Sequence, residues 1–448
     1  MKTKLNCFFF LLLIVICSSL ANHTAARQKK SQLPESLASE TFNLTNDMEV
    51  GLEIQARSPG ASWAREGAEA AALLIFVDGI YNQDLLLWAG DELFAYRVML
   101  GRLAKGTHTV SVALNLPRSA RGAHLAEVKA LRPLPFSPKR LNTAEEDQIA
   151  LAHSPVLYAR ANTIDHFTDI PLVMYYEILR SGKTDLTVRY SAIFTNEDGG
   201  TQTLALMARW GRATDIEWVY EFRVQDGKII DETFQGVNHE TKTFTGMRTT
   251  GQHPLLAVAS DNNNFSDLAC SAVRFAPLAF RADLESATRE SVMDKYPQTY
   301  RVMTEELQRE HRISPLPSGI NIIADPRDYF YIEASSEQSG AALGFDVKVA
   351  GQPDVFSSDL DDARLRIDRS GNFRTAIRLP HGVLPAAVEN ITARCQATLQ
   401  PAGARGCNHL KLLRVLMLDQ SFVPRALTLQ AQPEASLAPG ENKVFAVR

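Results

Sequence analysis

Acidic and imidazole side chains are densest between Tyr190 and Asp261. Within this stretch, Asp215 and Glu217 stand two residues apart in a segment that alternates between polar and apolar residues. Side chains two apart on a strand face the same side, with Cα atoms about 6.7 Å apart, so the two carboxylates would form a pair. Hard cations such as Ca²⁺ and Mg²⁺ prefer several such oxygens. The spacing therefore indicates a site for a divalent cation, Ca or Mg, or for a polar ligand.

Other side chains of this stretch would complete the site. The predicted metal ligands are Glu197, Asp198, Asp215, Glu217 and His239. The predicted ligand-contacting residues are Trp210, Arg212 and His253. A histidine would favour a transition metal or act as an acid or base. A competing interpretation is that Asp215 and Glu217 belong to the solvated face of an amphipathic strand, which Glu221 and Arg223 continue.

Two segments of this stretch resemble the necrosis-inducing (NPP1-like) proteins, which are jelly rolls. The segments are Tyr190-Ser-Ala-Ile-Phe-Thr-Asn-Glu-Asp198 and Gly211-Arg-Ala-Thr-Asp-Ile-Glu217. In that family a Tyr-Ser strand ends in an Asp, and a Gly-His-Arg-His-Asp-Trp-Glu motif supplies metal ligands. The related Vps62-like family has a segment similar to His253-Pro-Leu-Leu-Ala-Val-Ala259. The resemblance implies a jelly roll with a cation site.

Residue by residue, the resemblance is partial. Gly211, Asp215 and Glu217 match the motif, and Glu197 or Asp198 falls where the upstream acid belongs. The two histidines of the motif are replaced by Arg212 and Thr214, and its tryptophan by Ile216. The missing histidines argue against cytolytic activity.

A shorter resemblance suggests an enzyme. Asp215-Ile-Glu-Trp218 is similar to part of the laminarinase-type glycosidase signature Glu-x-Asp-x-Glu-Trp. In that family the first Glu is the nucleophile and the last is the acid/base, but Ala213 occupies the nucleophile position here. Without that carboxylate, double displacement has no covalent partner. The alternative function is therefore a carbohydrate-active hydrolase or lyase that uses Asp215 and Glu217 as an acid/base pair.

The N-terminus predicts export. Lys2 and Lys4 precede an apolar run, Phe8–Cys17, which has the length of a signal peptide rather than of an anchor. We assign residues 1–26 to this signal peptide and expect a secreted or periplasmic protein. No later run approaches the ~20 apolar residues of a membrane helix, so no transmembrane segment is expected after signal removal.

Composition and cysteine spacing agree with an exported globular protein. The 448 residues carry a net charge of −4 and no long Lys/Arg cluster, which argues against nucleic acid as a partner. Cys395 and Cys407 flank a loop rich in turn residues, and in an oxidising compartment they are predicted to form a disulfide. Cys270 is expected to be buried and free.

The spacing of short strands and turns predicts a mainly β, multidomain protein of β-sandwich and jelly-roll type with a helical insert. After a linker (27–40), we expect an N-terminal β-sandwich (41–136) and a central jelly-roll-like domain (145–320) with a helical segment (283–312). A C-terminal β unit (321–430) and a loose tail (431–448) follow. Thr203–Trp210 is expected to be a strand.

The function predicted from these patterns is that of an exported, non-catalytic binding protein. Its central domain would hold a divalent cation or a polar ligand. A glycan or another cell-surface ligand is the expected partner.

Overall fold

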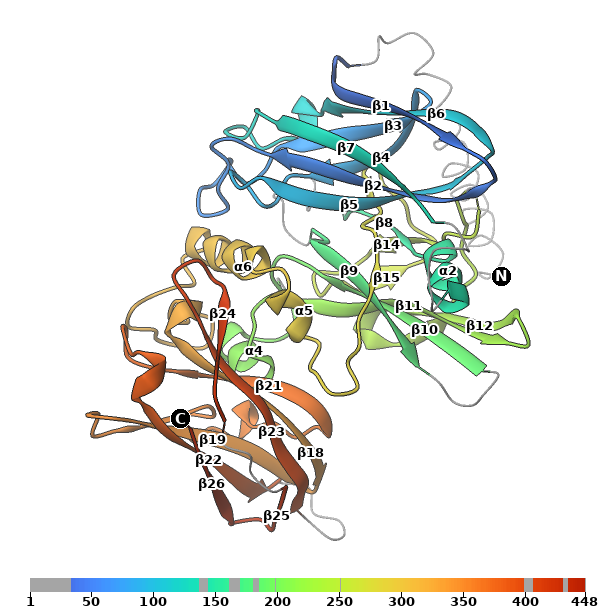
Figure 1. Cartoon of the computed structure of the whole chain (residues 1–448). Helices are drawn as coiled ribbons and strands as arrows, with labels where there is room; N and C mark the ends of the chain where they lie inside the picture. The colour runs from blue at the N-terminus through green and yellow to red at the C-terminus, as the bar shows by residue number, and fades with distance from the viewer. Residues whose placement is uncertain are drawn as a thin grey trace, which may run out of the picture. The chain divides into compact units, whose positions relative to one another are not determined.

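The computed structural model describes residues 34–136, 144–160, 170–179, 185–197, 199–249, 251–398, 406–429 and 434–447. The predicted signal peptide and Asp198 lie outside these ranges. The chain folds into two compact units: an N-terminal unit of residues 1–62, 67–192 and 217–281, and a C-terminal unit of residues 63–66, 193–216 and 282–448. Most elements are strands in antiparallel sheets (Figure 1), so the mainly β, sandwich-type prediction is confirmed.

The N-terminal unit begins with a sandwich of two sheets. One sheet has the strand order β1-β6-β3-β4 and the other β5-β2-β7. Their strands are β1 (Ser36–Leu44), β2 (Met48–Arg57), β3 (Ala72–Val77), β4 (Ile80–Leu86), β5 (Phe94–Leu103), β6 (Gly106–Leu114) and β7 (Glu127–Pro135).

The predicted linker is partly wrong, because β1 pairs with β6 from Ser36 onward. This strand lies at a sheet edge and is largely exposed, which explains its polar, linker-like composition.

Two further sheets follow in the same unit, with orders β13-β12-β11-β10-β9-β17 and β15-β14-β8-β16. A short helix, α2 (Ala144–Ala152), precedes them. The strands are β8 (Val156–Tyr158), β9 (Val173–Leu179), β10 (Asp185–Ile193), β11 (Ile216–Gln225), β12 (Lys228–Gln235), β13 (Thr241–Thr243), β14 (Leu255–Val258), β15 (Phe265–Ser266), β16 (Arg274–Phe275) and β17 (Phe280–Arg281). A hairpin turn at Gln225-Asp-Gly227 joins β11 to β12, and Asp226 and Gly227 both have positive φ.

The C-terminal unit is a second sandwich with helices. One sheet has the order β21-β18-β23-β24, with β25 also pairing with β23, and the other has β20-β19-β22-β26. Phe330, Leu343, Phe345 and Ile391 are fully buried in its core. The strands are β18 (Tyr329–Ser339), β19 (Ala341–Val349), β20 (Val355–Ser357), β21 (Gly371–Arg378), β22 (Val388–Ala397), β23 (Gly406–Leu418), β24 (Pro424–Leu427), β25 (Ala435–Leu437) and β26 (Asn442–Ala446).

The predicted tail is therefore not loose, because β25 and β26 lie within it and pair with β23 and β22. A disulfide joins Cys395 on β22 to Cys407 on β23, with Cα atoms 6.0 Å apart, and so links the two sheets. Cys270 is not part of this disulfide, and it is half-buried rather than buried.

The helices differ from the sequence expectations in two places. Thr203–Trp210 is helix α4, not a strand, and it ends at Gly211, whose φ of 63° caps it. The segment predicted to be helical from 283 contains only α5 (Ser291–Asp294) and α6 (Gln298–Arg309). The Asp283 carboxylate accepts the N–H of Glu285 at 3.2 Å, a local bond that competes with helix formation. No helix among the described residues is long and apolar enough to cross a membrane.

Candidate functional site

A polar cluster in the N-terminal unit brings together two of the predicted site residues, Glu217 and His239. Glu217 lies on β11, and His239 closes a short 3-10 helix, η3 (Val237–His239), that follows β12. Oε2 of Glu217 lies 3.7 Å from Nδ1 of His239. Gln235, the last residue of β12, contacts both side chains through Nε2 and donates a hydrogen bond to Glu217. The end of one hairpin strand thus holds the acid and the imidazole together.

Two asparagines of the loop between β14 and β15 complete this cluster. Nδ2 of Asn262 lies 2.7 Å from Nε2 of His239, and Nδ2 of Asn264 lies 3.4 Å from Nδ1. Both imidazole nitrogens therefore face side-chain amides. We call Glu217, Gln235, His239, Asn262 and Asn264 the amide–imidazole cluster.

The cluster is buried at its base and exposed at His239. Gln235 and Asn264 are 1% and 2% exposed, whereas the His239 side chain is 53% exposed. Oε1 of Gln235 is buried and has no hydrogen-bond partner among the described residues. His239 has a φ of 59°, and Asn238 and Asn263 also have positive φ. Such conformations cost about 1–3 kcal/mol each and often occur at functional sites.

His253 lies apart from this cluster, in the interior of the same unit. It is 1% exposed, with Nδ1 2.8 Å from the carbonyl of Ser154 and Nε2 2.9 Å from a carboxylate oxygen of Glu49. Both ring nitrogens are thus used in holding β2 against the segment before β8. The prediction that His253 contacts a ligand at a rim does not fit this environment.

Glu197 and Asp215 come together in the C-terminal unit. The Glu197 N–H donates to the carbonyl of Ala213 at 3.2 Å, and the Phe194 N–H donates to that of Asp215 at 2.8 Å. Burial, and then the charge of Asp215, raise the pKa of Glu197 from its ordinary value to about 7. Asn196 is 1% exposed, and neither atom of its amide has a partner among the described residues.

This acid pair falls short of the predicted cation site. Glu217 belongs to the N-terminal unit, and Asp198 lies outside the described residues. No group of three His, Cys, Asp or Glu side chains in the described part of the chain is suited to hold a metal ion. Ca²⁺ takes about 6–8 oxygens, so Glu197 and Asp215 alone do not fit it. The cation site stays a prediction.

Arg212 and Trp210 already have partners within the C-terminal unit. Arg212 is 3% exposed, and its Nε donates to Glu290 at 3.2 Å. The guanidinium carbons of Arg209 and Arg369 lie over the Trp210 ring, 4.9 and 4.8 Å from its centre. The ring is covered by cations and offers little room for a stacked sugar.

A larger charge network in the C-terminal unit has no counterpart in the sequence analysis. Arg374 is fully buried and donates to Asp294 and Glu333, each at 2.6 Å, and Arg414 pairs with the same two acids. Burial acts to raise the pKa of Asp294, but the charges of Arg374 and Arg414 outweigh it, so the pKa is lowered. Each acid has a cationic partner, which indicates a structural role. Its members lie on α5, β18, β21 and β23, a convergence that a single sequence does not reveal.

The cluster members missed by the sequence analysis are Gln235, Asn262 and Asn264. The two asparagines belong to the run of three after Asp261, which indicates a loop and no more, and Gln235 carries no sequence signal of its own.

Comparison with known proteins yields no relative that informs this site. No protein-family model matches the chain. No curated protein matches it either. Among solved structures, a ruminal GH26 endo-beta-1,4-mannanase aligns over 27% of this chain and 26% of its own, at 15% identity and a TM-score of 0.16.

Proposed function

We propose that this chain is an exported, non-catalytic binding protein that takes a polar, hydroxyl-bearing ligand at the amide–imidazole cluster. The observation that carries the proposal is the convergence of one carboxylate and three carboxamides around the imidazole of His239. Carboxamides donate and accept at once, and a carboxylate accepts, so together they match the alternating donors and acceptors of a saccharide.

The geometry supports recognition in two ways. The buried base fixes Gln235 and Asn264, so little side-chain entropy remains to be lost on binding. The half-exposed imidazole of His239 leaves the cluster reachable from solvent. A small number of placed polar groups on a rigid scaffold is the usual composition of a specific ligand site.

The experiment is a thermal-shift screen of the mature protein against monosaccharides and oligosaccharides, followed by calorimetry on any ligand found. Glu217→Gln should weaken binding at least ~10-fold, because it removes a charge-assisted hydrogen bond. Glu221→Gln is the matched control. Glu221 lies on the same strand, where it pairs with Arg189 at 2.6 Å, and this variant should bind like the wild type. Equal weakening in both variants, or no saccharide binding at all, would count against the proposal.

The hydrolase or lyase alternative rests on Asp215 and Glu217 acting as a pair. Asp215 is 1% exposed, whereas the carboxylate of Glu217 contacts Gln235 and His239. Activity on a polysaccharide panel that disappears in Glu217→Gln would favour the enzyme over the binding protein.

The cation prediction has a separate test at Glu197 and Asp215. The protein is unfolded thermally in EDTA and then with excess Ca²⁺ or Mg²⁺. An ion that binds the folded state at 100 times its dissociation constant would add about 2.7 kcal/mol to the free energy of unfolding, and Asp215→Ala would abolish the gain. No shift with either ion would remove the cation from the proposed ligands.

A further inference from the structure

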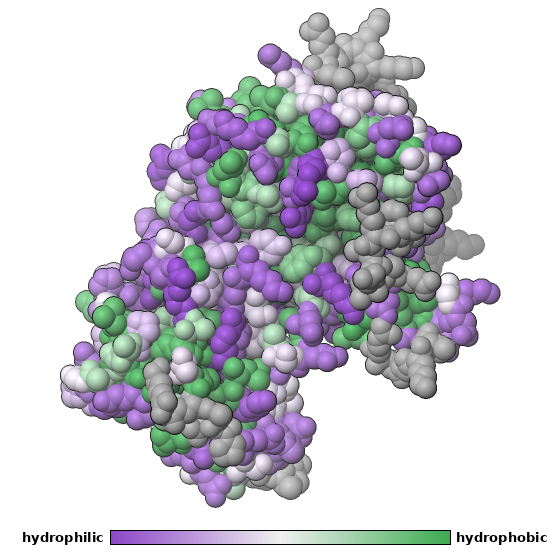
Figure 2. Space-filling view, viewed as in Figure 1, coloured by the Kyte–Doolittle hydropathy of each residue, from purple (hydrophilic) through white to green (hydrophobic). Residues whose placement is uncertain are grey.

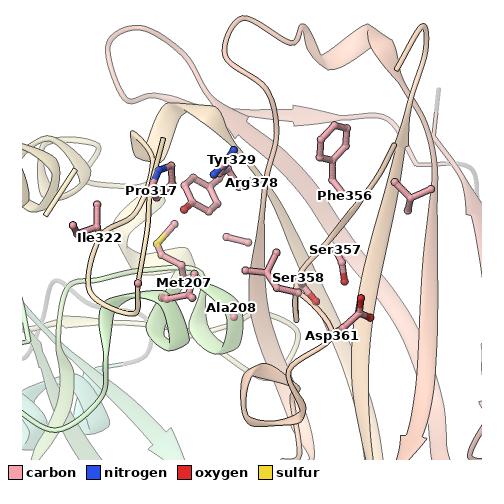
Figure 3. A pocket seen from close by; sticks show the side chains of 15 residues that line it. Met207, Ala208, Pro317, Ile322, Tyr329, Phe356, Ser357, Ser358, Asp361 and Arg378 are labelled. Carbon is pink, nitrogen blue, oxygen red and sulfur yellow. The ribbon is translucent and has the colours of Figure 1, made fainter. Parts of the chain in front are cut away.

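A pocket of about 470 Å³ lies in the C-terminal unit, and none of the residues discussed as ligands above lines it. Leu204 and Met207 of α4 form one wall, and Ile322 and Phe356 contribute from the segments around β18 and β20. Figure 3 shows Met207 extending from its helix toward the side on which Tyr329 lies. This volume is within the range of about 300–1,000 Å³ that is usual for small-molecule sites, and the walls named here are apolar.

One cationic side chain lines the pocket without a charge partner. Arg378 ends β21, opposite Tyr329 on β18, and the two lie side by side in Figure 3. It is exposed and makes no ion pair within the described part of the chain. Arg374, four residues earlier on the same strand, is instead paired with two acids. The guanidinium of Arg378 suits a carboxylate, which it can bind through two parallel hydrogen bonds.

The other polar groups of the pocket are engaged or point to solvent. The Ser357 hydroxyl donates to Asp359 at 2.7 Å, and the Ser358 hydroxyl accepts the N–H of Phe345 at 2.9 Å. Asp361 has a 94% exposed side chain and lies on the opposite side from Arg378 (Figure 3). The negative charge of Asp361 would repel an anion on its side of the pocket. An anionic group of a ligand is therefore expected at Arg378.

Apolar side chains continue from the pocket to the surface. Val355 and Leu360 line it and are 56% and 59% exposed, and Leu316 and Ile320, on either side of the lining residues Pro317 and Gly319, are 80% and 47% exposed. Apolar residues are also visible among polar ones on the surface of this unit in Figure 2. Large apolar side chains that gather at a concave, cation-bearing site indicate a ligand with an apolar body.

We infer that this pocket binds a medium-chain aliphatic carboxylate, with the carboxylate on Arg378 and the chain along Leu204, Met207 and Phe356. The inference does not depend on the proposed saccharide site, which lies in the other unit.

The test uses octanoate and, as the uncharged probe of equal chain length, octan-1-ol. Calorimetry on the mature protein should show saturable octanoate binding with a dissociation constant below about 1 mM. Arg378→Gln should weaken octanoate at least ~10-fold and octan-1-ol less than about twofold, because only the anion uses the guanidinium. Arg425→Gln is the matched control, an exposed arginine of the same unit that pairs with Asp419, and it should bind both probes like the wild type.

Two measurements locate the probe. Leu204→Trp should fill the pocket and abolish octanoate binding without lowering the melting temperature by more than a few degrees. In wild-type protein labelled at the methionine methyl groups, octanoate should shift the Met207 resonance, and this reading does not require a folded variant. Absence of saturable octanoate binding, equal loss of both probes in Arg378→Gln, or an unmoved Met207 resonance at saturation would overturn the inference.

Discussion

His239 and His253 were assigned to one site from the sequence, yet they have opposite environments. The side chain of His239 is 53% exposed and lies among amides, whereas that of His253 is 1% exposed and bonded to Glu49 and Ser154. Both partners of His253 come from segments about 100 or more residues away, so no local pattern distinguishes it from a ligand. The Glu217–His239 contact is easier to predict, because Glu217 lies on β11 and His239 follows β12, and these two strands form a hairpin.

Glu197 should make the C-terminal unit less stable as the pH rises. Its pKa is raised from an ordinary value of 4.5 to about 7 by burial and the charge of Asp215. Between these two values the folded chain holds the proton and the unfolded chain does not, so stability falls with rising pH, by up to about 3 kcal/mol. Glu197→Gln should remove this loss and be more stable than the wild type at pH 8 but not near pH 4.5.

Urea unfolding at both pH values in EDTA measures this effect, with the exposed Glu389→Gln as the control. A Glu197→Gln variant that is no more stable than the wild type at pH 8 would show that Glu197 is ionised without penalty.

Among single elements, the predicted helical segment (283–312) does contain α6, whereas the strand expected at Thr203–Trp210 is a helix. Polar and apolar residues alternate along β10 and β11, as expected of half-buried strands. Thr203–Trp210 forms α4 rather than the expected strand. Thr203, Leu206 and Met207 are buried at the i, i+3, i+4 spacing of a helix, and Gly211 caps it. A segment of eight residues is too short to distinguish the period of a strand from that of a helix, and tertiary packing decides between the two.

Substitution of Gly211, which caps α4, should lower the free energy of unfolding more than the same substitution of Gly227. A Cβ on Gly211 would lie 2.8 Å from Cγ of Arg374, whereas one on Gly227 would meet nothing within 4 Å. Both glycines have positive φ, so each change to Ala should cost about 1 kcal/mol for the backbone. Gly211→Ala should cost clearly more, because the buried arginine must also move. If both variants lose the same free energy of unfolding in urea, the side chain of Arg374 moves aside without cost.

The disulfide should stabilise the C-terminal sandwich. It joins β22 to β23 with a sequence separation of 12 residues, and a closed loop of this size is worth about 3 kcal/mol. Replacing Cys395 and Cys407 with Ala should lower the unfolding free energy by about 2–4 kcal/mol, while Cys270→Ser serves as the control for thiol removal. An unchanged denaturation midpoint in the double variant would show that sheet packing alone holds the two strands.

At the scale of the whole molecule, the two units should respond to acid in opposite directions. Burial, and then the charge of Arg248, lower the pKa of His153 in the N-terminal unit from 6.5 to about 4. Between these values only the unfolded chain binds the proton, so this contribution to stability falls as the pH drops from 6.5 to 4. Glu197 acts in the opposite sense in the C-terminal unit over an overlapping range.

Hydrogen exchange at pH 5 and pH 7 resolves the two units. On going from pH 7 to pH 5, the N-terminal unit of the wild type should lose more protection than that of His153→Phe. Over the same change, the C-terminal unit of the wild type should gain protection relative to that of Glu197→Gln. Parallel changes in both units would contradict these assignments.

The division into units was not predictable from composition. The chain leaves the N-terminal unit after Ala192 and returns at Glu217, so the residues predicted for one site are divided between two units. No proline-rich or polar linker marks either crossing, since both fall within or beside strands β10 and β11.

Binding of a polar ligand at the amide–imidazole cluster is tested best by the imidazole NMR spectrum of the mature protein during titration with the saccharide found by screening. The ring resonances of His239 should shift along a saturation curve with the dissociation constant measured by calorimetry. Those of His381, which is 86% exposed in the other unit, should stay in place. An unmoved His239 ring at saturating ligand would contradict the account and place the saccharide elsewhere on the molecule.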